Sequence, residues 1–440
     1  MAQPPEGAPA SAVYAQRRAQ LAQRMGEGIA IIPTAPERAR NRDSHYPYRF
    51  DSYFYYLTGF TEPDSVLVLI AGSEPRSILF CRDKDKEREI WDGFRYGPDA
   101  ARTVFGFDES YRIAELDAQM PALIANQPRI WCHLGSDVAW DARVLAWVNA
   151  VRAQVRSGVA APGAIADVHT LIDEMRLIKD AHELAIMRRA AQISTSAHQR
   201  AMRATAPGRR EYAIEAELLH EFRQGGAQSP AYTSIVAGGA NACVLHYVQN
   251  DAVLKAGDLL LIDAGCELDG YASDITRTFP VDGKFSPAQR DIYELVLAAQ
   301  AAALSTIAPG VPWEAPHEAA VRVLAQGMID FNLCQGSVDA VIESGAYRKY
   351  YMHRTGHWLG LDVHDAGDYK RNGEWRKLEP GMVLTVEPGC YIQAGDGVPA
   401  HFANIGVRIE DDVTVTAAGY EVLTTAAPKT VVDIEALMRG

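Results

Sequence analysis

The sequence lacks the features that mark several large functional classes. No apolar run approaches the ~20 residues that a membrane-spanning helix needs. The first dozen residues, MAQPPEGAPASA, have no basic start followed by an apolar stretch, so we expect no signal peptide. Basic residues are not in excess, and the net charge of −13 at pH 7 argues against binding to nucleic acid or to an anionic membrane.

Cysteine is scarce and dispersed. The six cysteines lie at 81, 132, 243, 266, 334 and 390, and no two of them form a CxxC pair, which argues against a zinc ribbon. We therefore expect buried, reduced thiols in a cytoplasmic protein. The 48% apolar and 22% charged residues are typical of a globular protein. A chain of 440 residues predicts two or three domains, since single cores stop growing near ~250–300 residues.

The first part of the chain, 1–176, is predicted to be an α/β domain. Short apolar runs bounded by turn residues predict strands at 28–35, 65–72 and 76–81, and helical apolar spacing follows at 115–125 and 142–155. The aromatic segment YPYRFDSYFYYLTGF (46–60) is interpreted as a core strand within a packing cluster.

The character of the sequence changes near residue 177, and we expect a second domain over 177–440. A long amphipathic helix is predicted over 177–204, with Asp180 near its start. A second helix over 210–226 ends at a pair of glycines, which favour a helix end. Most residues able to carry chemistry follow these two helices.

Two segments of the second domain repeat one pattern. LKAGDLLLIDAG (254–265) and LEPGMVLTVEPG (378–389) share four of twelve positions, and Asp263 and Glu387 fall on the same register. Turn–strand–turn segments often look alike, which is an alternative explanation for the matches. It does not explain an acid at the end of both apolar runs, where a carboxylate is costly unless something positive meets it.

Each of these acids has a second acid downstream. If Asp269-Gly270 is a two-residue turn, Asp263 faces Thr276 across a hairpin, and Asp274 lies on the same face and diagonal to Asp263. A three-residue turn would break this parity. After Glu387, the segment 406–415 delivers Glu410 from a strand.

Four acids brought together would repel one another unless they were protonated or bound to cations. Two divalent ions would balance four carboxylates, and a neutral histidine would complete the site. The stretch HRTGHWLGLDVHD (353–365) holds three of the twelve histidines and lies just before Glu387. Carboxylates with one imidazole favour Mn²⁺, with Co²⁺ or Zn²⁺ as alternatives.

The motifs IDAG…YASDITRTF, HRTGHWLGLDVHD, LTVEPGCYI and VRIEDD, in this order, resemble the pita-bread metallopeptidases, in particular the aminopeptidase P family. The segment YRFDSYFYYLTGF is similar to that family's amino-terminal domain, so the resemblance covers nearly the whole chain. It implies an α/β amino-terminal domain followed by an α+β pita-bread catalytic domain with an internal pseudo-twofold repeat.

The resemblance also implies roles for individual residues. Asp274 and Glu410 would bridge two metal ions, Asp263 would chelate one ion, and His357 and Glu387 would hold the other. The resemblance further implies catalytic roles for Glu387, His246, His353 and His364, and substrate contacts for Arg408, Tyr391 and Trp91.

The activity implied by the resemblance is removal of the N-terminal residue from Xaa-Pro-Yaa peptides. A hydroxide bridging the two ions would attack the scissile carbonyl, and Glu387 would pass the proton to the leaving nitrogen. Trp91 resembles a tryptophan that reaches the site of a neighbouring subunit, which implies a homodimer or homotetramer.

Several alternatives stay open at this point. Xaa-Pro dipeptidase (prolidase) shares the ligands, whereas methionine aminopeptidase usually lacks so large a preceding domain. A protein of this fold that binds without catalysis is a rival of another class. His353 and Trp91 could simply pack, and Arg408 could pair with a nearby acid. Arg354 departs from the family's usual glycine after the first histidine of its motif.

Overall fold

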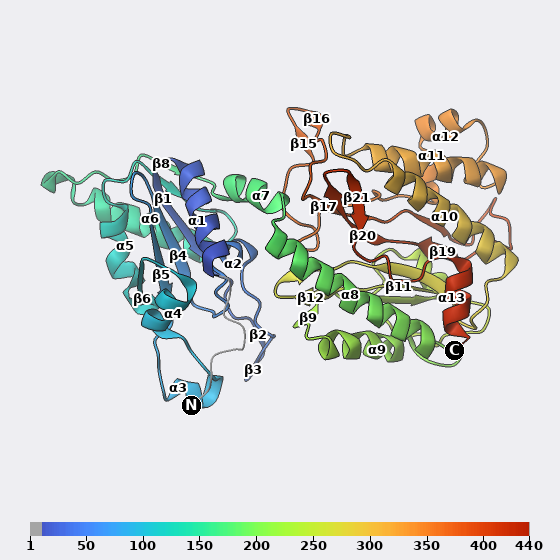
Figure 1. Ribbon diagram of the computed structural model, residues 1–440, viewed down its shortest axis with the longest axis horizontal. Helices are drawn as coiled ribbons and strands as arrows, with labels where there is room; N and C mark the ends of the chain where they lie inside the picture. The colour runs from blue at the N-terminus through green and yellow to red at the C-terminus, as the bar shows by residue number, and fades with distance from the viewer. Residues whose placement is uncertain (1–10, 440) are drawn as a thin grey trace. The chain divides into compact units, whose positions relative to one another are not determined.

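The computed structural model describes residues 11–439 and divides into two compact units, Met1–Met175 and Arg176–Gly440. The sequence-based domain limits, 1–176 and 177–440, stay a prediction. Among the described residues, no helix is long and apolar enough to cross a membrane. Figure 1 shows the elements of each unit along the chain.

The first unit is built on a six-stranded mixed sheet in the order β6-β5-β4-β1-β7-β8. Strands β1, β4 and β5 pair antiparallel, and the outer strands β6, β7 and β8 join in parallel. The strand bounds are β1 (Gly28–Pro33), β4 (Val66–Ala71), β5 (Arg76–Cys81), β6 (Glu109–Arg112), β7 (Arg129–Trp131) and β8 (Ala164–Ala166). The runs predicted at 28–35, 65–72 and 76–81 are therefore strands.

Helices lie on both faces of this sheet, so the first unit is an α/β sandwich of three layers (Figure 1). One layer holds the predicted helices, α5 (Leu116–Ile124) and α6 (Val138–Arg152), which close one core with the strands. The other layer holds α1 (Ser11–Met25), α2 (Ser52–Thr58) and α4 (Gly97–Phe105). Shorter elements complete the unit: β2 (Ala39–Asn41), β3 (Ser44–His45) and α3 (Arg88–Asp92).

The strand expected within 46–60 is wrong, because Ser52–Thr58 forms helix α2. The Asp51 carboxylate caps the helix by accepting from the Phe54 N–H, and Gly59 ends it with a positive φ of 64°. Such local capping outweighs the strand preference of tyrosine and phenylalanine. The expected aromatic cluster is present, since Phe50 stacks on Tyr55 with ring centroids 4.0 Å apart.

The second unit repeats one arrangement, a packed helix pair followed by a long β-hairpin. The first pair is α8 (Ala181–Ala204) with α9 (Glu211–Gln224), and the second is α10 (Pro287–Ser305) with α11 (Ala315–Asp330). Asp180 caps α8 in a capping box with Glu183, as its place near the predicted helix start suggests. The remaining helices are α7 (His169–Leu177), which runs into this unit from the first, α12 (Val338–Ser344) and α13 (Val431–Met438).

The first hairpin has the register that a two-residue turn requires. Asp263 pairs with Thr276 and Leu268 with Tyr271, so one alignment runs through the whole hairpin. Asp269 and Gly270 both have positive φ, 48° and 82°, as a type I′ turn demands. Its strands are β11 (Leu259–Asp263), β12 (Cys266–Leu268), β13 (Tyr271–Ala272) and β14 (Thr276–Pro280), with β9 (Ser229–Pro230) and β10 (Ile235–Gly238) alongside.

The second hairpin follows the same plan. Val386 pairs with Asp411 and Gly389 with Arg408, which is one register and sets Glu387 opposite Glu410. Its strands are β17 (Val383–Val386), β18 (Gly389–Ile392), β19 (Ile405–Arg408) and β20 (Asp411–Thr416), followed by β21 (Gly419–Val422). A small hairpin, β15 (Lys370–Arg371) with β16 (Glu374–Trp375), precedes it.

Candidate metal centre

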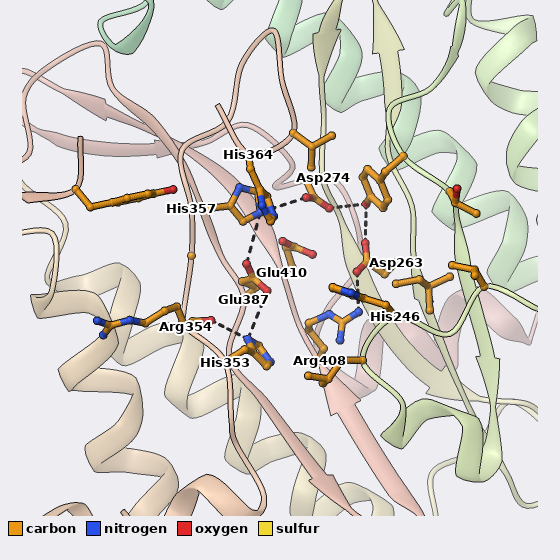
Figure 2. A pocket seen from close by; sticks show the side chains of 18 of the residues that line it. His246, Asp263, Asp274, His353, Arg354, His357, His364, Glu387, Arg408 and Glu410 are labelled. Atoms are coloured by element: carbon orange, nitrogen blue, oxygen red, sulfur yellow. Dashed lines mark hydrogen bonds and ion pairs between the residues drawn. The ribbon is translucent and has the colours of Figure 1, made fainter. Parts of the chain in front are cut away.

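The two hairpins and the histidine-rich stretch line a single cavity of about 790 Å³ in the second unit. All four predicted acids and all four predicted histidines line it: Asp263, Asp274, Glu387, Glu410, His246, His353, His357 and His364. Figure 2 shows these side chains converging from the two hairpins and from loops that are far apart in the sequence. The structure therefore brings together every predicted metal-ligand candidate.

The hydroxyl of Tyr232 lies between the carboxylates of Asp263 and Asp274 and contacts both. This oxygen lies 2.6 Å from Asp263 Oδ1 and also hydrogen-bonds Asp274 Oδ1. A phenol has one proton and can donate to only one carboxylate at a time, so the pair is left with excess negative charge. Tyr232 was missed by the sequence analysis. It precedes β10, and only the pairing of Ile235 with Asp263 brings it to the site.

Asp274, His357 and Glu410 each present a potential ligand atom within 4.8 Å of the others. His357 Nε2 lies 3.5 Å from Asp274 Oδ2 and 3.6 Å from Glu387 Oε1. His357 Nδ1 lies 2.9 Å from the carbonyl oxygen of Trp358, which accepts the Nδ1 proton, so that in the neutral ring the Nε2 lone pair faces the acids. This is the tautomer that a metal ligand needs.

Burial raises the pKa of three of the four acids. The pKa of Glu387 rises to about 7, that of Glu410 rises well above its usual range, and that of Asp263 also rises. Burial pushes the pKa of Asp274 in the same direction, but the hydrogen bond and charge of His357 outweigh it and lower that pKa. The cluster thus holds more negative charge than the protein groups alone neutralise.

The same imbalance acts on His357. Burial lowers its pKa, but the hydrogen bond to Asp274 and the negative charge of Glu387 outweigh burial and raise the pKa to about 9. When His357 is protonated, the proton on Nε2 faces Asp274 and Glu387, which would also attract a metal cation. Carboxylates with one imidazole are a donor set that divalent ions of the Mn²⁺, Co²⁺ and Zn²⁺ group accept. The residues therefore fit a metal centre.

Arg408 is buried at the edge of this cluster and pairs with an acid. Its guanidinium donates to Asp263 Oδ2 at 2.6 Å, to the Tyr391 hydroxyl at 2.9 Å and to Thr276 Oγ1 at 3.0 Å. Arg408 thus forms a salt bridge with Asp263, which was the alternative to a substrate contact in the sequence analysis. Tyr391 is buried behind the cavity rather than lining it, and its hydroxyl also contacts His353 Nε2 at 2.8 Å.

The remaining three histidines surround the acids at different depths. His353 Nδ1 lies 3.7 Å from Glu387 Oε2, and burial together with the charge of Arg408 lowers the His353 pKa to about 3, so the ring is neutral. His364 lies beside His357 with ring centroids 4.2 Å apart. His246 is exposed on the cavity wall (Figure 2).

Two groups of residues in the first unit also bear on function. Trp91, on α3, is 83% exposed, so it does not pack into a core, which was the alternative to a contact with a neighbouring subunit. His133, Asp167 and His169 form a second group of close ligand atoms. The rings of His133 and His169 are stacked with 12° between their planes, so their in-plane nitrogen lone pairs run side by side rather than toward one ion.

The sequence matches two family descriptions: Metallopeptidase family M24 over residues 185–417, and Aminopeptidase P, N-terminal domain, over residues 14–131. Together they define the class of the protein, a metallopeptidase with an aminopeptidase P type amino-terminal domain.

Individual relatives are similar over almost the whole chain. The Xaa-Pro aminopeptidases of Haemophilus influenzae and Escherichia coli are each 44% identical, over 97% of this chain and 96% and 97% of theirs. The solved structure of Pseudomonas aeruginosa aminopeptidase PepP is 51% identical, covers 100% of this chain and 99% of its own, and superposes with a TM-score of 0.96. This chain belongs to the aminopeptidase P family of M24 pita-bread metallopeptidases.

Proposed function

We propose that this protein is a Xaa-Pro aminopeptidase that removes the N-terminal residue from peptides with proline in the second position. Two relatives named Xaa-Pro aminopeptidase support this proposal, because they are similar to this chain over nearly the full length of both chains. The observation that carries the proposal is the convergence of four carboxylates and one correctly oriented imidazole in one cavity. A binding module without catalysis would not need to retain all five groups.

Five side chains are proposed as ligands of two divalent ions: Asp263, Asp274, His357, Glu387 and Glu410. Their four carboxylates carry a charge of −4, which two ions of +2 balance. We expect Mn²⁺, and the solved structure of a Zn-substituted E. coli aminopeptidase P in complex with product is a relative of 43% identity. The family resemblance implies that Asp274 and Glu410 would each contact both ions, and their ligand atoms lie within 4.8 Å of each other and of His357.

When bound, two divalent ions supply a lowered pKa for a water molecule and polarisation of the scissile carbonyl. Glu387 is the proposed proton carrier. Its carboxylate lines the cavity, where it can reach both a water molecule and the leaving nitrogen. The ring nitrogen of proline has to gain a proton to leave. Glu387 Oε2 lies 3.7 Å from His353 Nδ1, at the proposed pocket for the proline ring.

Imidazole N–H groups can donate hydrogen bonds to negative charge that develops on the substrate. His353 is held by Tyr391 and by the carbonyl of Arg354, which fixes its ring beside Glu387. His246 and His364 lie on the cavity wall, where they can orient the substrate. Removing one donor of this kind typically lowers a rate by ~10²–10³.

The test is a comparison of peptide products with Mn²⁺ supplied to the pure protein. The proposed function predicts release of the first residue from Xaa-Pro-Yaa and slow cleavage of the Xaa-Pro dipeptide. Cleavage of the dipeptide with no action on longer peptides would identify a prolidase instead. Metal binding without hydrolysis of either would identify a binding protein.

Three further properties belong to the proposal. The six cysteines are buried free thiols, which suits a reducing compartment such as the cytoplasm. Trp91 exposes a large apolar surface, and we expect it to contact a neighbouring subunit of a homodimer or homotetramer. Arg408 and His353 are proposed to bound the pocket for the proline ring, with Tyr391 holding both from behind.

A further inference from the structure

A second cavity of about 930 Å³ adjoins the metal-centre cavity in the second unit, and the two share His353 and Arg354 in their walls. Helix α11 and the segment after α12 form most of the second cavity, so its polar side chains come from parts of the chain that supply no predicted metal ligand. In Figure 2, Arg354 lies near His353, and its side chain points away from the acid cluster.

Arg354 is held in place by two neighbours. Its Nη1 atom donates to both carboxylate oxygens of Glu314, at 2.6 and 2.9 Å. Its guanidinium carbon lies 5.0 Å from the centre of the Trp375 ring, a cation–π distance. The side chain is nevertheless 52% exposed at the cavity boundary.

These contacts use only one nitrogen of the guanidinium. Within residues 11–439, Nε and Nη2 of Arg354 have no hydrogen-bond partner. The Nε–Nη2 edge is the fork that pairs with a carboxylate through two parallel N–H···O bonds. Glu314 and Trp375 therefore orient the guanidinium without occupying this edge.

Arg354 lies close enough to the predicted metal ligands to reach a peptide bound there. It directly follows His353, whose Nδ1 lies 3.7 Å from Glu387 Oε2. An extended peptide advances ~3.3–3.6 Å per residue, so a group one to three residues beyond the scissile bond comes within reach of an arginine side chain here. His317, which lines the second cavity, is a neutral polar neighbour: burial and the charges of Arg354 and Arg348 lower its pKa to about 4.

We propose that the Nε–Nη2 edge of Arg354 binds a carboxylate of the substrate on the carboxyl side of the proline, and that the second cavity receives this end of the peptide. The inference rests on the proposed function and deepens it, because it names the class of peptide that the site prefers. The carboxylate is either the free C-terminus of a short peptide or an acidic side chain after the proline.

Two matched peptide pairs distinguish these sources. The first pair is Ala-Pro-Ala and its C-terminal amide, and the second is Ala-Pro-Glu-amide and Ala-Pro-Gln-amide. With the Mn²⁺-loaded full chain, we expect kcat/KM to favour the carboxylate member of at least one pair by about threefold to tenfold, the range of one partly exposed charge-assisted contact. The effect should lie mainly in KM and should shrink at high ionic strength.

Arg354→Gln should abolish the preference while leaving cleavage of the amides in place. Arg354→Lys, which keeps the charge and lacks the fork, should retain part of it. The matched control is Arg322→Gln in the same cavity, whose guanidinium pairs with Asp339 at 3.1 Å, and it should keep the full preference. Thermal unfolding of each variant reports whether it is folded.

The outcomes separate the two proposals. Equal kcat/KM for both members of both pairs, or a preference that survives Arg354→Gln, overturns the role of Arg354 and leaves the proposed function intact. No release of the first residue from any of the four peptides contradicts the proposed function, and the inference falls with it.

Discussion

The substitution Asp365→Asn probes the buried ion cluster that anchors the histidine-rich stretch. Asp365 closes this stretch, and its side chain is 1% exposed. It accepts from Arg176 at 2.6 Å and from Lys179 at 2.8 Å, and both of these cations are also buried. Its backbone N–H bonds the carbonyl of Trp358 at 2.9 Å, which folds the stretch back on itself.

Replacing Asp365 by asparagine keeps the shape and removes the charge. Breaking a buried pair by removing one partner typically costs ~3–5 kcal/mol, because the remaining charge is left uncompensated. The matched control is Asp339→Asn, which removes an acid from the exposed pair with Arg322, where the two side chains are 73% and 64% exposed. Exposed pairs contribute about 0–1 kcal/mol. The two variants therefore compare one change of charge in two environments.

The assay is thermal and urea unfolding of wild type and both variants across a range of pH. Burial raises the pKa of Asp365, but the charges of Lys179 and Arg176 outweigh it and lower the pKa. A carboxyl group with a lowered folded-state pKa stabilises the protein above its unfolded pKa of ~3.9, and this contribution is lost as the pH falls through the folded value. The difference between wild type and Asp365→Asn should thus be full at pH 7 and shrink below about pH 4. Equal destabilisation by Asp365→Asn and Asp339→Asn at pH 7 would show that burial of the Asp365 ion cluster does not increase its contribution to stability.

The remaining predictions concern the site. Asp263→Ala, Asp274→Ala and Glu410→Ala should each abolish hydrolysis and lower bound metal, measured by elemental analysis; normal metal content with near-normal turnover would remove that residue from the site. His357→Ala should lose metal, whereas His353→Ala should keep two ions per chain and lose ~10²–10³ in turnover, so the opposite pattern would reverse their roles. Xaa-Pro-Yaa should be cut roughly ten- to a hundredfold faster than Xaa-Ala-Yaa, because a pocket shaped for proline leaves an alanine N–H unpaired at ~1–3 kcal/mol; equal rates would refute the proline preference.

The first hairpin and its acids could be predicted because they depend on local rules. An Asp-Gly turn fixes the register, the register pairs Asp263 with Thr276, and this pairing sets the two acids on one face. The capped helix α8 follows from an equally local pattern at Asp180. In the first unit, by contrast, the prediction of a strand at helix α2 is wrong, because the caps at Asp51 and Gly59 outweigh the strand preference of the aromatic residues.

The side chains that complete the site depend on tertiary contacts, which no short motif encodes. Tyr232 reaches Asp263 only because β10 pairs with β11. His317 comes from helix α11, and its Nδ1 lies 2.9 Å from Thr355 Oγ1, 38 residues away in the sequence. The departure at Arg354 was visible in the sequence, but its orientation depends on Glu314 and Trp375, which only the fold brings next to it.

Two divalent ions, held by five side chains, are proposed to drive cleavage at Xaa-Pro bonds. The most direct test is to remove metal with a chelator, titrate Mn²⁺ into the metal-free protein and follow release of the first residue from Ala-Pro-Ala. We expect no activity without metal and a rise in activity that levels off at about two ions per chain, since two divalent ions balance the charge of four carboxylates. Full activity in the metal-free protein, or two bound ions with no release of the first residue, would contradict it.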